Sequence, residues 1–207
     1  MSIERRKIVA AYGAHLELTP AAGGMKAAIA KATELASQPN HVMLSQFENK
    51  YNPQAHELTT AAEIVADFSK LDAFVAGVGT GGTISGVAKV LKEKGYNTKI
   101  IAVEPEASPV LSGGNPGPHK IQGIGAGFLP NTMDMSLVSE VEKVSNDDAL
   151  NAARAIAKSD GLMIGISGGA SYVAAKRVAK RLGAGKKVLF IAPDNGERYL
   201  STELYGA

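Results

Sequence analysis

Five residues near the middle of the chain, Gly79-Thr80-Gly81-Gly82-Thr83, have types and spacing suited to binding a phosphate group. Glycine lets the backbone approach an anion without a Cβ clash, and threonine hydroxyls donate hydrogen bonds. An apolar run at residues 74–78 predicts a buried strand before this loop, and a helical pattern follows it. The unpaired N–H groups and the dipole of a first helical turn attract anions. The pattern predicts a phosphate monoester site, and a tight strand-to-helix turn without a ligand is the alternative.

Two common nucleotide-binding patterns are absent from this loop. It lacks the Lys-Ser/Thr pair of a nucleoside-triphosphate P-loop, and it lacks the full G-x-G-x-x-G pattern with a following acidic residue. The predicted ligand is therefore a phosphate monoester and not a nucleotide.

A second glycine-rich turn, Gly165-Ile166-Ser167-Gly168-Gly169-Ala170, also opens a predicted helix. Serine is among the residues preferred at a helix N-cap, so the spacing alone favours Ser167 as a cap. The alternative is that its hydroxyl faces a ligand at the edge of the sheet.

Composition excludes several other classes of site. The chain has no cysteine, so disulfides, thiolate nucleophiles and cysteine metal sites are excluded. Its four histidines do not have the spacing of a zinc protease, and we expect no metal. A formal net charge of +2 with both signs spread along the chain predicts no nucleic-acid binding. No apolar run reaches membrane-spanning length, and the charged start is unlike a signal peptide, which is typical of a cytoplasmic protein.

The strands and helices that position these loops can be predicted from the spacing of apolar residues. Apolar runs predict strands, and spacing of three to four residues predicts helices. The expected strands are residues 16–18, 42–44, 74–78, 100–103, 138–144 and 188–192. The expected helices are residues 3–12 with Ser2 as N-cap, 25–36, 60–68, 84–94, 146–158 capped by Asn146 or Asp147, and 167–182. Residues 46–56 and 104–130 are expected to be loops.

The alternation of these elements predicts an α/β fold with a parallel sheet covered by helices on both faces. We expect two units: residues 1–45 as the remnant of a smaller α/β domain, and residues 46–207 as the ligand-binding α/β domain. The first unit offers only two strands, which cannot form a stable sheet alone. The sequence therefore predicts that upstream strands are missing.

Three stretches together resemble the cysteine synthase (O-acetylserine sulfhydrylase) family. They are residues 77–83, the stretch Lys120–Phe128 (KIQGIGAGF) and the stretch Gly196–Thr202 (GERYLST). The opening Met-Ser-Ile-Glu-Arg-Arg and the Asn52-Pro53…His56 segment fit as well. The resemblance covers essentially the whole chain in order.

The resemblance implies a fold-type-II pyridoxal-phosphate enzyme that makes L-cysteine from O-acetyl-L-serine and sulfide by β-replacement. It implies that Gly79, Thr80, Gly81, Gly82 and Thr83 hold the phosphate of pyridoxal 5'-phosphate and that Ser167 binds its pyridine nitrogen. It implies that Gln46 helps to hold the substrate carboxylate and that Gly123 lines the active-site cleft. It also implies a homodimer and, through His56 and His119, docking of the serine acetyltransferase C-terminal tail. For both histidines a loop-packing role is the alternative.

One catalytic part of the family pattern has no counterpart in this chain. The lysine that forms the Schiff base lies upstream of the Met-Ser-Ile-Glu-Arg-Arg stretch in the family, as does the Ser/Thr-Gly-Asn-Thr-Gly substrate loop. Lysine both anchors the cofactor and moves the α-proton, so we expect no covalent attachment in the usual way and no activity from this chain alone. The alternatives are a non-catalytic module that binds phosphate ligands or the acetyltransferase tail, and part of a cystathionine β-synthase-like enzyme.

Overall fold

A four-stranded parallel sheet organises the larger part of the chain in this computed structural model, which describes residues 2–206. The strands are β1 (Ala73–Gly77), β2 (Lys99–Pro105), β3 (Glu140–Val144) and β4 (Val188–Phe190). Their order in the sheet is β3-β2-β1-β4, and every pairing is parallel. The predicted α/β class with a parallel sheet is confirmed.

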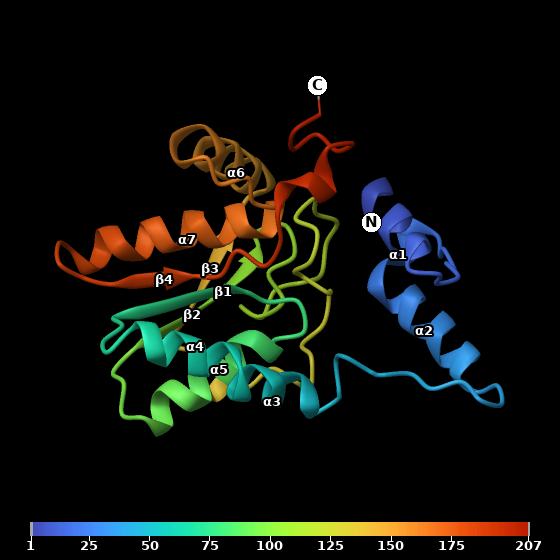
Figure 1. Ribbon diagram of the computed structural model, residues 1–207, viewed down its shortest axis with the longest axis horizontal. Helices are drawn as coiled ribbons and strands as arrows, with labels where there is room; N and C mark the ends of the chain where they lie inside the picture. Colours follow the sequence, from blue (N-terminus) through green and yellow to red (C-terminus); the bar gives the residue numbers. More distant parts are fainter. Residues whose placement is uncertain (1, 207) are drawn as a thin grey trace.

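Helices cover both faces of this sheet (Figure 1). On one face lie α3 (Tyr51–Leu58), α4 (Thr60–Asp67) and α5 (Gly82–Glu93), and on the other lie α6 (Asn146–Asp160) and α7 (Ile166–Leu182). Within β1, Phe74 packs with the first group and Val75 with the second. A strand buried on both sides has no polar face to present to water, which explains why β1 reads as a continuous apolar run.

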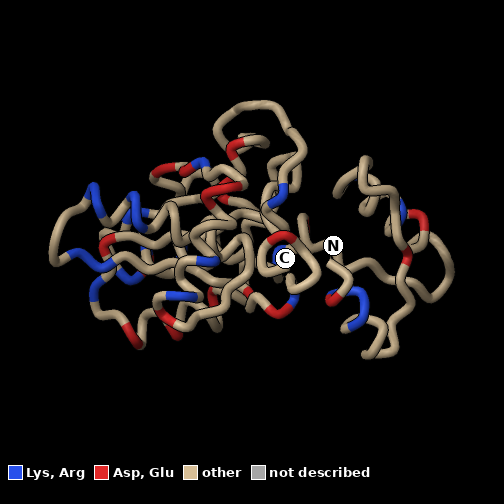
Figure 2. Tube along the Cα trace, turned by 90° about the horizontal axis from the view of Figure 1, so that it is seen from above, with Lys and Arg blue, Asp and Glu red and all other residues tan. Residues whose placement is uncertain are grey.

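The N-terminal residues form a separate group beside the sheet (Figures 1 and 2). They comprise α1 (Ile3–Ala11), the short 3-10 helix η1 (Ala21–Gly23) and α2 (Gly24–Ala36), followed by a connector that runs to α3. Ser2 caps α1 as predicted, and its hydroxyl accepts a hydrogen bond from Arg5 N at 3.4 Å. Two further 3-10 helices, η2 (Met135–Leu137) and η3 (Gly196–Tyr199), lie in the sheet-containing part.

The prediction of two strands in the first 45 residues is wrong. Residues 16–18 and 42–44 have no strand geometry, and Val42 and Leu44 are 87% and 79% exposed. A strand needs hydrogen-bonded neighbours, and no segment among residues 2–206 pairs with either stretch. Their apolar character does not by itself produce a strand.

Two local boundaries also differ from the prediction. Residues 46–56 do not form one loop, because α3 begins at Tyr51, whose N–H donates to Asn49 Oδ1 at 3.0 Å. The cap of α6 is Ser145 and not Asn146 or Asp147, since the Ser145 hydroxyl accepts from Asp148 N at 3.1 Å. In both places a side chain just before the helix accepts a hydrogen bond from one of the free N–H groups of its first turn.

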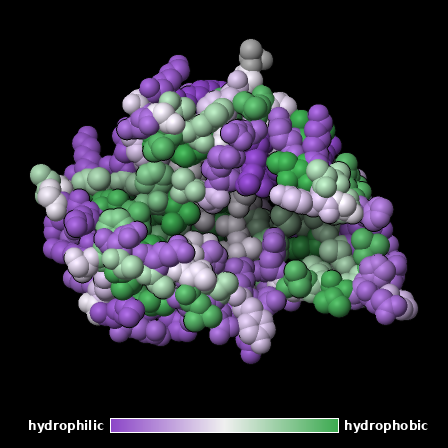
Figure 3. All heavy atoms as spheres, viewed as in Figure 1, coloured by the Kyte–Doolittle hydropathy of each residue, from purple (hydrophilic) through white to green (hydrophobic). Residues whose placement is uncertain are grey.

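The surface carries charges of both signs and has a large hollow. Lys and Arg residues are interspersed with Asp and Glu along the whole chain (Figure 2). No helix in the described part of the chain has the length and apolarity needed to span a bilayer. The surface is hollowed between the N-terminal group and the sheet (Figure 3).

Candidate functional site

A cavity of about 1070 Å³ lies at the carboxyl ends of β1 and β4, between the sheet and residues 21–26 of the N-terminal group. Ligands bind at this edge in open α/β sheets. The structure brings seven of the eight predicted site residues to the cavity wall, namely Gln46, Gly79, Thr80, Gly81, Thr83, Gly123 and Ser167. The eighth, Gly82, is buried at the start of α5 and does not line the cavity.

The glycine-threonine loop connects β1 to α5, and two of its glycines are needed for steric reasons. A Cβ on Gly79 would lie 2.4 Å from the carbonyl oxygen of Gly123. Gly81, the N-cap of α5, has φ +82°, and a Cβ there would meet Met133 at 2.6 Å. The bare backbone therefore borders the cavity beside the positive end of the α5 dipole, which is suited to an anion.

Asn52 holds this loop in place from α3. Its Nδ2 donates hydrogen bonds to Gln46 O at 2.7 Å and to Thr80 Oγ1 at 2.9 Å. A Cβ on Gly82 would lie 2.0 Å from Asn52 Oδ1, so Gly82 leaves the space that this amide fills. Sequence reasoning did not include Asn52 among the site residues. The only available signal was the Asn-Pro pair in the segment that carries the family resemblance.

Thr132 supports the loop from the other side. Its hydroxyl donates to Thr80 O at 2.6 Å, and its N–H donates to Phe47 O at 3.2 Å. Thr132 is buried, so these bonds connect the loop to the end of the connector without competition from water. Because Thr132 lies in a long irregular segment, no sequence pattern marks it.

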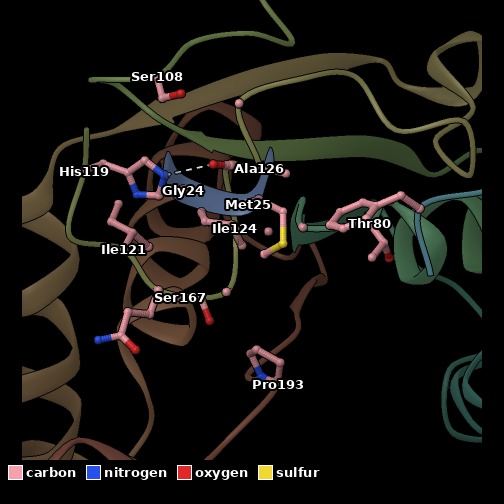
Figure 4. A pocket seen from close by; sticks show the side chains of 18 of the residues that line it. Gly24, Met25, Thr80, Ser108, His119, Ile121, Ile124, Ala126, Ser167 and Pro193 are labelled. Atoms are coloured by element: carbon pink, nitrogen blue, oxygen red, sulfur yellow. Dashed lines mark hydrogen bonds between the residues drawn. The ribbon is translucent and has the colours of Figure 1, made fainter. Parts of the chain in front are cut away.

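Ser167 is not a helix cap. The N-cap of α7 is Gly165, which makes no side-chain capping bond, and Ser167 is the second residue of the helix. The Ser167 side chain is 3% exposed, lines the cavity, and its Oγ forms no hydrogen bond with any other described residue. Figure 4 shows Ser167 and Thr80 at different sides of the same space. The sequence-based preference for a cap is wrong, and the hydroxyl is available to a ligand.

The two histidines singled out by sequence both make packing contacts. His56 Nδ1 lies 2.9 Å from Thr60 Oγ1 and its Nε2 lies 3.1 Å from Thr83 Oγ1, and burial lowers the pKa of this imidazole. His119 Nε2 donates to Gly125 O at 3.0 Å, as Figure 4 shows, and its Nδ1 is buried. His56 therefore supports the glycine-threonine loop through Thr83, and His119 supports the turn that contains Gly123.

Three side chains join α1 to the segment that follows β4. Arg5 donates to Asp194 Oδ2 and, at 3.0 Å, to Tyr199 Oη, and Tyr199 in turn donates to Asp194 Oδ2 at 2.7 Å. Arg5, Asp194 and Tyr199 all line the cavity. We call this group the clasp. Sequence reasoning missed it because Arg5 lies 189 positions before Asp194 and 194 positions before Tyr199.

We expect the clasp tyrosine to make stability depend on pH in the alkaline range. Burial, with the hydrogen bond to Asp194, raises the pKa of Tyr199 from 10.0 to about 12. A group whose pKa is higher in the folded state stabilises the fold below its unfolded pKa, so the contribution is lost between about pH 10 and about pH 12. The free energy of unfolding, measured with denaturant across this pH range, should decline less in Tyr199→Phe than in the original chain.

The control for this prediction is Tyr12→Phe, because the Tyr12 side chain is 86% exposed. It should leave both the pH profile of stability and the last step of the tyrosinate absorbance titration unchanged. Equal profiles for Tyr199→Phe and the original chain would contradict the prediction.

Comparison with known proteins places the whole chain in one family. Residues 1–194 match the family described as pyridoxal-phosphate dependent enzyme. The cysteine synthase of Staphylococcus aureus (strain Mu50 / ATCC 700699) is 55% identical over 207 residues, which are 99% of this chain and 67% of the relative.

Solved structures agree with the sequence match. Cysteine synthase from Entamoeba histolytica superimposes with a TM-score of 0.91 at 46% identity, over 99% of this chain and 62% of that chain. The O-acetylserine dependent cystathionine β-synthase from Helicobacter pylori superimposes with a TM-score of 0.94 at 43% identity, over 99% of this chain and 67% of that chain. An O-ureido-L-serine synthase superimposes with a TM-score of 0.94 at 39% identity, over 99% of this chain and 65% of that chain.

The chain thus spans about two thirds of the length of the relatives it matches. The matched part includes the glycine-threonine loop, the Gly123 turn and the start of α7, all of which line the cavity. The chain belongs to the family of pyridoxal-phosphate dependent enzymes and, within it, to the cysteine synthases.

Proposed function

We propose that this chain carries the cofactor-binding surface, and part of the substrate-binding surface, of a cysteine synthase that converts O-acetyl-L-serine and sulfide to L-cysteine. One observation carries the proposal: the glycine-threonine loop and Ser167, far apart in sequence, line a single cavity at the carboxyl edge of the sheet. The 55% identity to a cysteine synthase supports this reaction over related ones.

The residues around the cavity fit pyridoxal 5'-phosphate. At one end, Gly79 and Gly81 present bare backbone, Thr80 and Thr83 add hydroxyls, and α5 directs its N-terminus at the same point. At the other, Ser167 offers a hydroxyl with no protein partner among residues 2–206. The cavity volume of about 1070 Å³ is sufficient for such a ligand with substrate beside it.

Ser167 would set the electronic character of the ring. When bound, the cofactor supplies an electron sink for negative charge at the substrate α-carbon. A neutral hydroxyl does not hold a proton on the pyridine nitrogen as an aspartate would, so the sink stays weak. A weak sink suffices for β-replacement because the acetate group leaves as charge develops.

The substrate residues proposed are Gln46 and Gly123. The Gln46 side chain is exposed at the cavity wall, while its backbone oxygen is fixed by Asn52 at 2.7 Å. The side-chain amide of Gln46 can donate to a substrate carboxylate. Gly123 has φ +98°, so its backbone turns sharply beside Gly79.

We also propose that the polypeptide of 207 residues is not catalytic by itself. Lys26 is the one lysine in the described chain that borders the cavity, and it is exposed on α2. A lysine that anchors the cofactor and moves a proton works from a desolvated position next to the reacting atoms. None of the lysines of residues 2–206 has such surroundings.

Titration of the purified chain with pyridoxal 5'-phosphate tests these two proposals separately. We expect saturable, reversible binding that inorganic phosphate displaces, while pyridoxal without the phosphate binds weakly. Borohydride treatment at substoichiometric cofactor, followed by peptide mass mapping, should leave no lysine specifically labelled, and sulfide with O-acetyl-L-serine should give no cysteine. Failure to bind would contradict the cofactor site, whereas a specifically labelled lysine or turnover would contradict the lack of catalysis.

The proposed domain boundary near residue 45 has support in the arrangement of elements. Helices α1 and α2 lie beside the sheet-containing part and join it through the connector before α3 (Figure 1). We propose residues 1–45 as part of a smaller domain that covers the cavity. Docking of the serine acetyltransferase tail in this cavity remains a proposal, which titration with a peptide of that tail tests directly.

A further inference from the structure

The segment that follows β4 is attached to the start of α7. Asp194 O accepts a hydrogen bond from Gly165 N at 3.1 Å, and Gly196 N donates to Met163 O at 2.7 Å. Gly165 is the N-cap of α7, and Ser167 follows two residues later. The backbone of Asp194 is therefore attached to the residue at which α7 begins. Figure 4 shows Pro193, which precedes Asp194, at the same end of the cavity as Ser167.

The Asp194 carboxylate is also directed at this helix start. Its side chain is 6% exposed, and Oδ2 accepts from Arg5 and Tyr199. Oδ1 is buried, has no hydrogen-bond partner in the described chain, and faces Gly165, where a Cβ would lie 2.0 Å away. Since Gly165 cannot cap α7 with a side chain, this carboxylate is the negative charge at the positive end of the helix dipole.

The positive partner of the carboxylate comes from α1. Arg5 is one of three residues in the first turn region of α1 that reach the C-terminal segment: Ser2 Oγ donates to Arg198 O at 2.5 Å, and Glu4 accepts from Ser201 N at 2.7 Å. Of the three, only Arg5 contacts Asp194. The N-terminal group that supplies residues 21–26 of the cavity wall is thus joined to the Ser167 helix through one ion pair, in which Asp194 is buried and Arg5 is partly exposed.

We propose that Asp194 is a positioning residue: held by Arg5 and Tyr199, it fixes the start of α7 and thereby Ser167, which couples docking of α1 over the cavity to the ligand contact at Ser167. A buried carboxylate that loses its cation is strongly destabilised. Detachment of α1 would therefore disturb the start of α7, while an intact clasp keeps the Ser167 hydroxyl in place. The role of Ser167 toward the pyridine ring rests on the proposed function, but the coupling does not.

Hydrogen exchange of the full chain without ligand tests the coupling. The probes are the amides of Gly165, which donates to Asp194 O, and Gly169, which donates to Gly165 O. We expect Asp194→Asn and Arg5→Met to speed exchange at both amides by about tenfold, the effect of losing a hydrogen bond to a charged group. Arg5→Lys should restore part of the protection.

Glu4→Gln is the matched control. It weakens the neighbouring link to Ser201 but does not touch Asp194, so the two amides should exchange as in the original chain. Unfolding free energies measured in parallel separate local opening from global loss of stability. Equal exchange in Asp194→Asn and the original chain, or the same acceleration in Glu4→Gln as in Arg5→Met, would overturn the proposal.

A double-mutant cycle with pyridoxal 5'-phosphate adds a second readout. If Asp194 acts through Ser167, the losses of affinity caused by Asp194→Asn and Ser167→Ala are not additive, and the double variant binds about as weakly as Ser167→Ala alone. Additive losses would show that Asp194 does not act through Ser167. Should the chain bind no pyridoxal 5'-phosphate, the proposed cofactor site fails while the exchange experiment still decides the role of Asp194.

Discussion

Replacing Gly79 by alanine is expected to weaken binding of pyridoxal 5'-phosphate and inorganic phosphate by about tenfold to a hundredfold, the effect of losing a hydrogen bond to a charged group. The new Cβ would lie 2.4 Å from Gly123 O, and both partners of this contact are backbone atoms. No side-chain rotation relieves it, so the end of β1 and the Gly123 turn must separate. Calorimetric titration of both ligands measures the loss.

Gly113→Ala is the matched control for this substitution. Gly113 has φ +82°, with nothing within 4 Å of an added Cβ, and it does not line the cavity. An alanine in this conformation costs about 1 kcal/mol of stability without touching the site. The control should bind both ligands as the original chain does. Binding by Gly79→Ala within about threefold of the original would contradict the phosphate assignment, since threefold lies inside ordinary context effects.

The sheet and the two glycine turns were predictable because their causes are local. β1 and β2 are buried on both faces, so each reads as an uninterrupted apolar run that needs no knowledge of distant residues. Gly79 and Gly81 are glycines because the backbone packs closely at the mouth of β1. Such a requirement is visible in sequence as a glycine cluster between a strand and a helix.

The residues that hold the site could not be predicted, because their causes are distant. Thr132 reaches Thr80 across 52 positions, and Arg5 reaches Asp194 across 189. Asn52 has no periodicity that separates it from any polar residue of a helix start. The expected strand at residues 42–44 was wrong for the opposite reason, since local composition favoured it and the described chain provides no neighbouring strand.

Phe74→Ala is expected to remove about 3–5 kcal/mol from the free energy of unfolding, as large-to-small changes of a buried aromatic do. Phe74 is 0% exposed in the central strand β1, where it packs with Ile84, Val87 and Ile100 on the α5 face of the sheet. A typical domain has only about 5–15 kcal/mol in total. Urea unfolding followed by circular dichroism measures the change.

Leu58→Ala is the control, because Leu58 is 71% exposed on α3 and its truncation should change stability by less than about 0.5 kcal/mol. The two large effects then differ in kind. Phe74→Ala lowers the folded fraction but leaves Gly79 and Gly123 in place, so saturating phosphate ligand should raise its stability by mass action. Gly79→Ala removes the binding geometry itself, so the same ligand should not stabilise it. A Phe74→Ala protein that is folded by circular dichroism yet gains no stability from ligand would contradict this distinction. That result would mean that the geometry of the loop depends on core packing at Phe74 and not only on the backbone contact at Gly79.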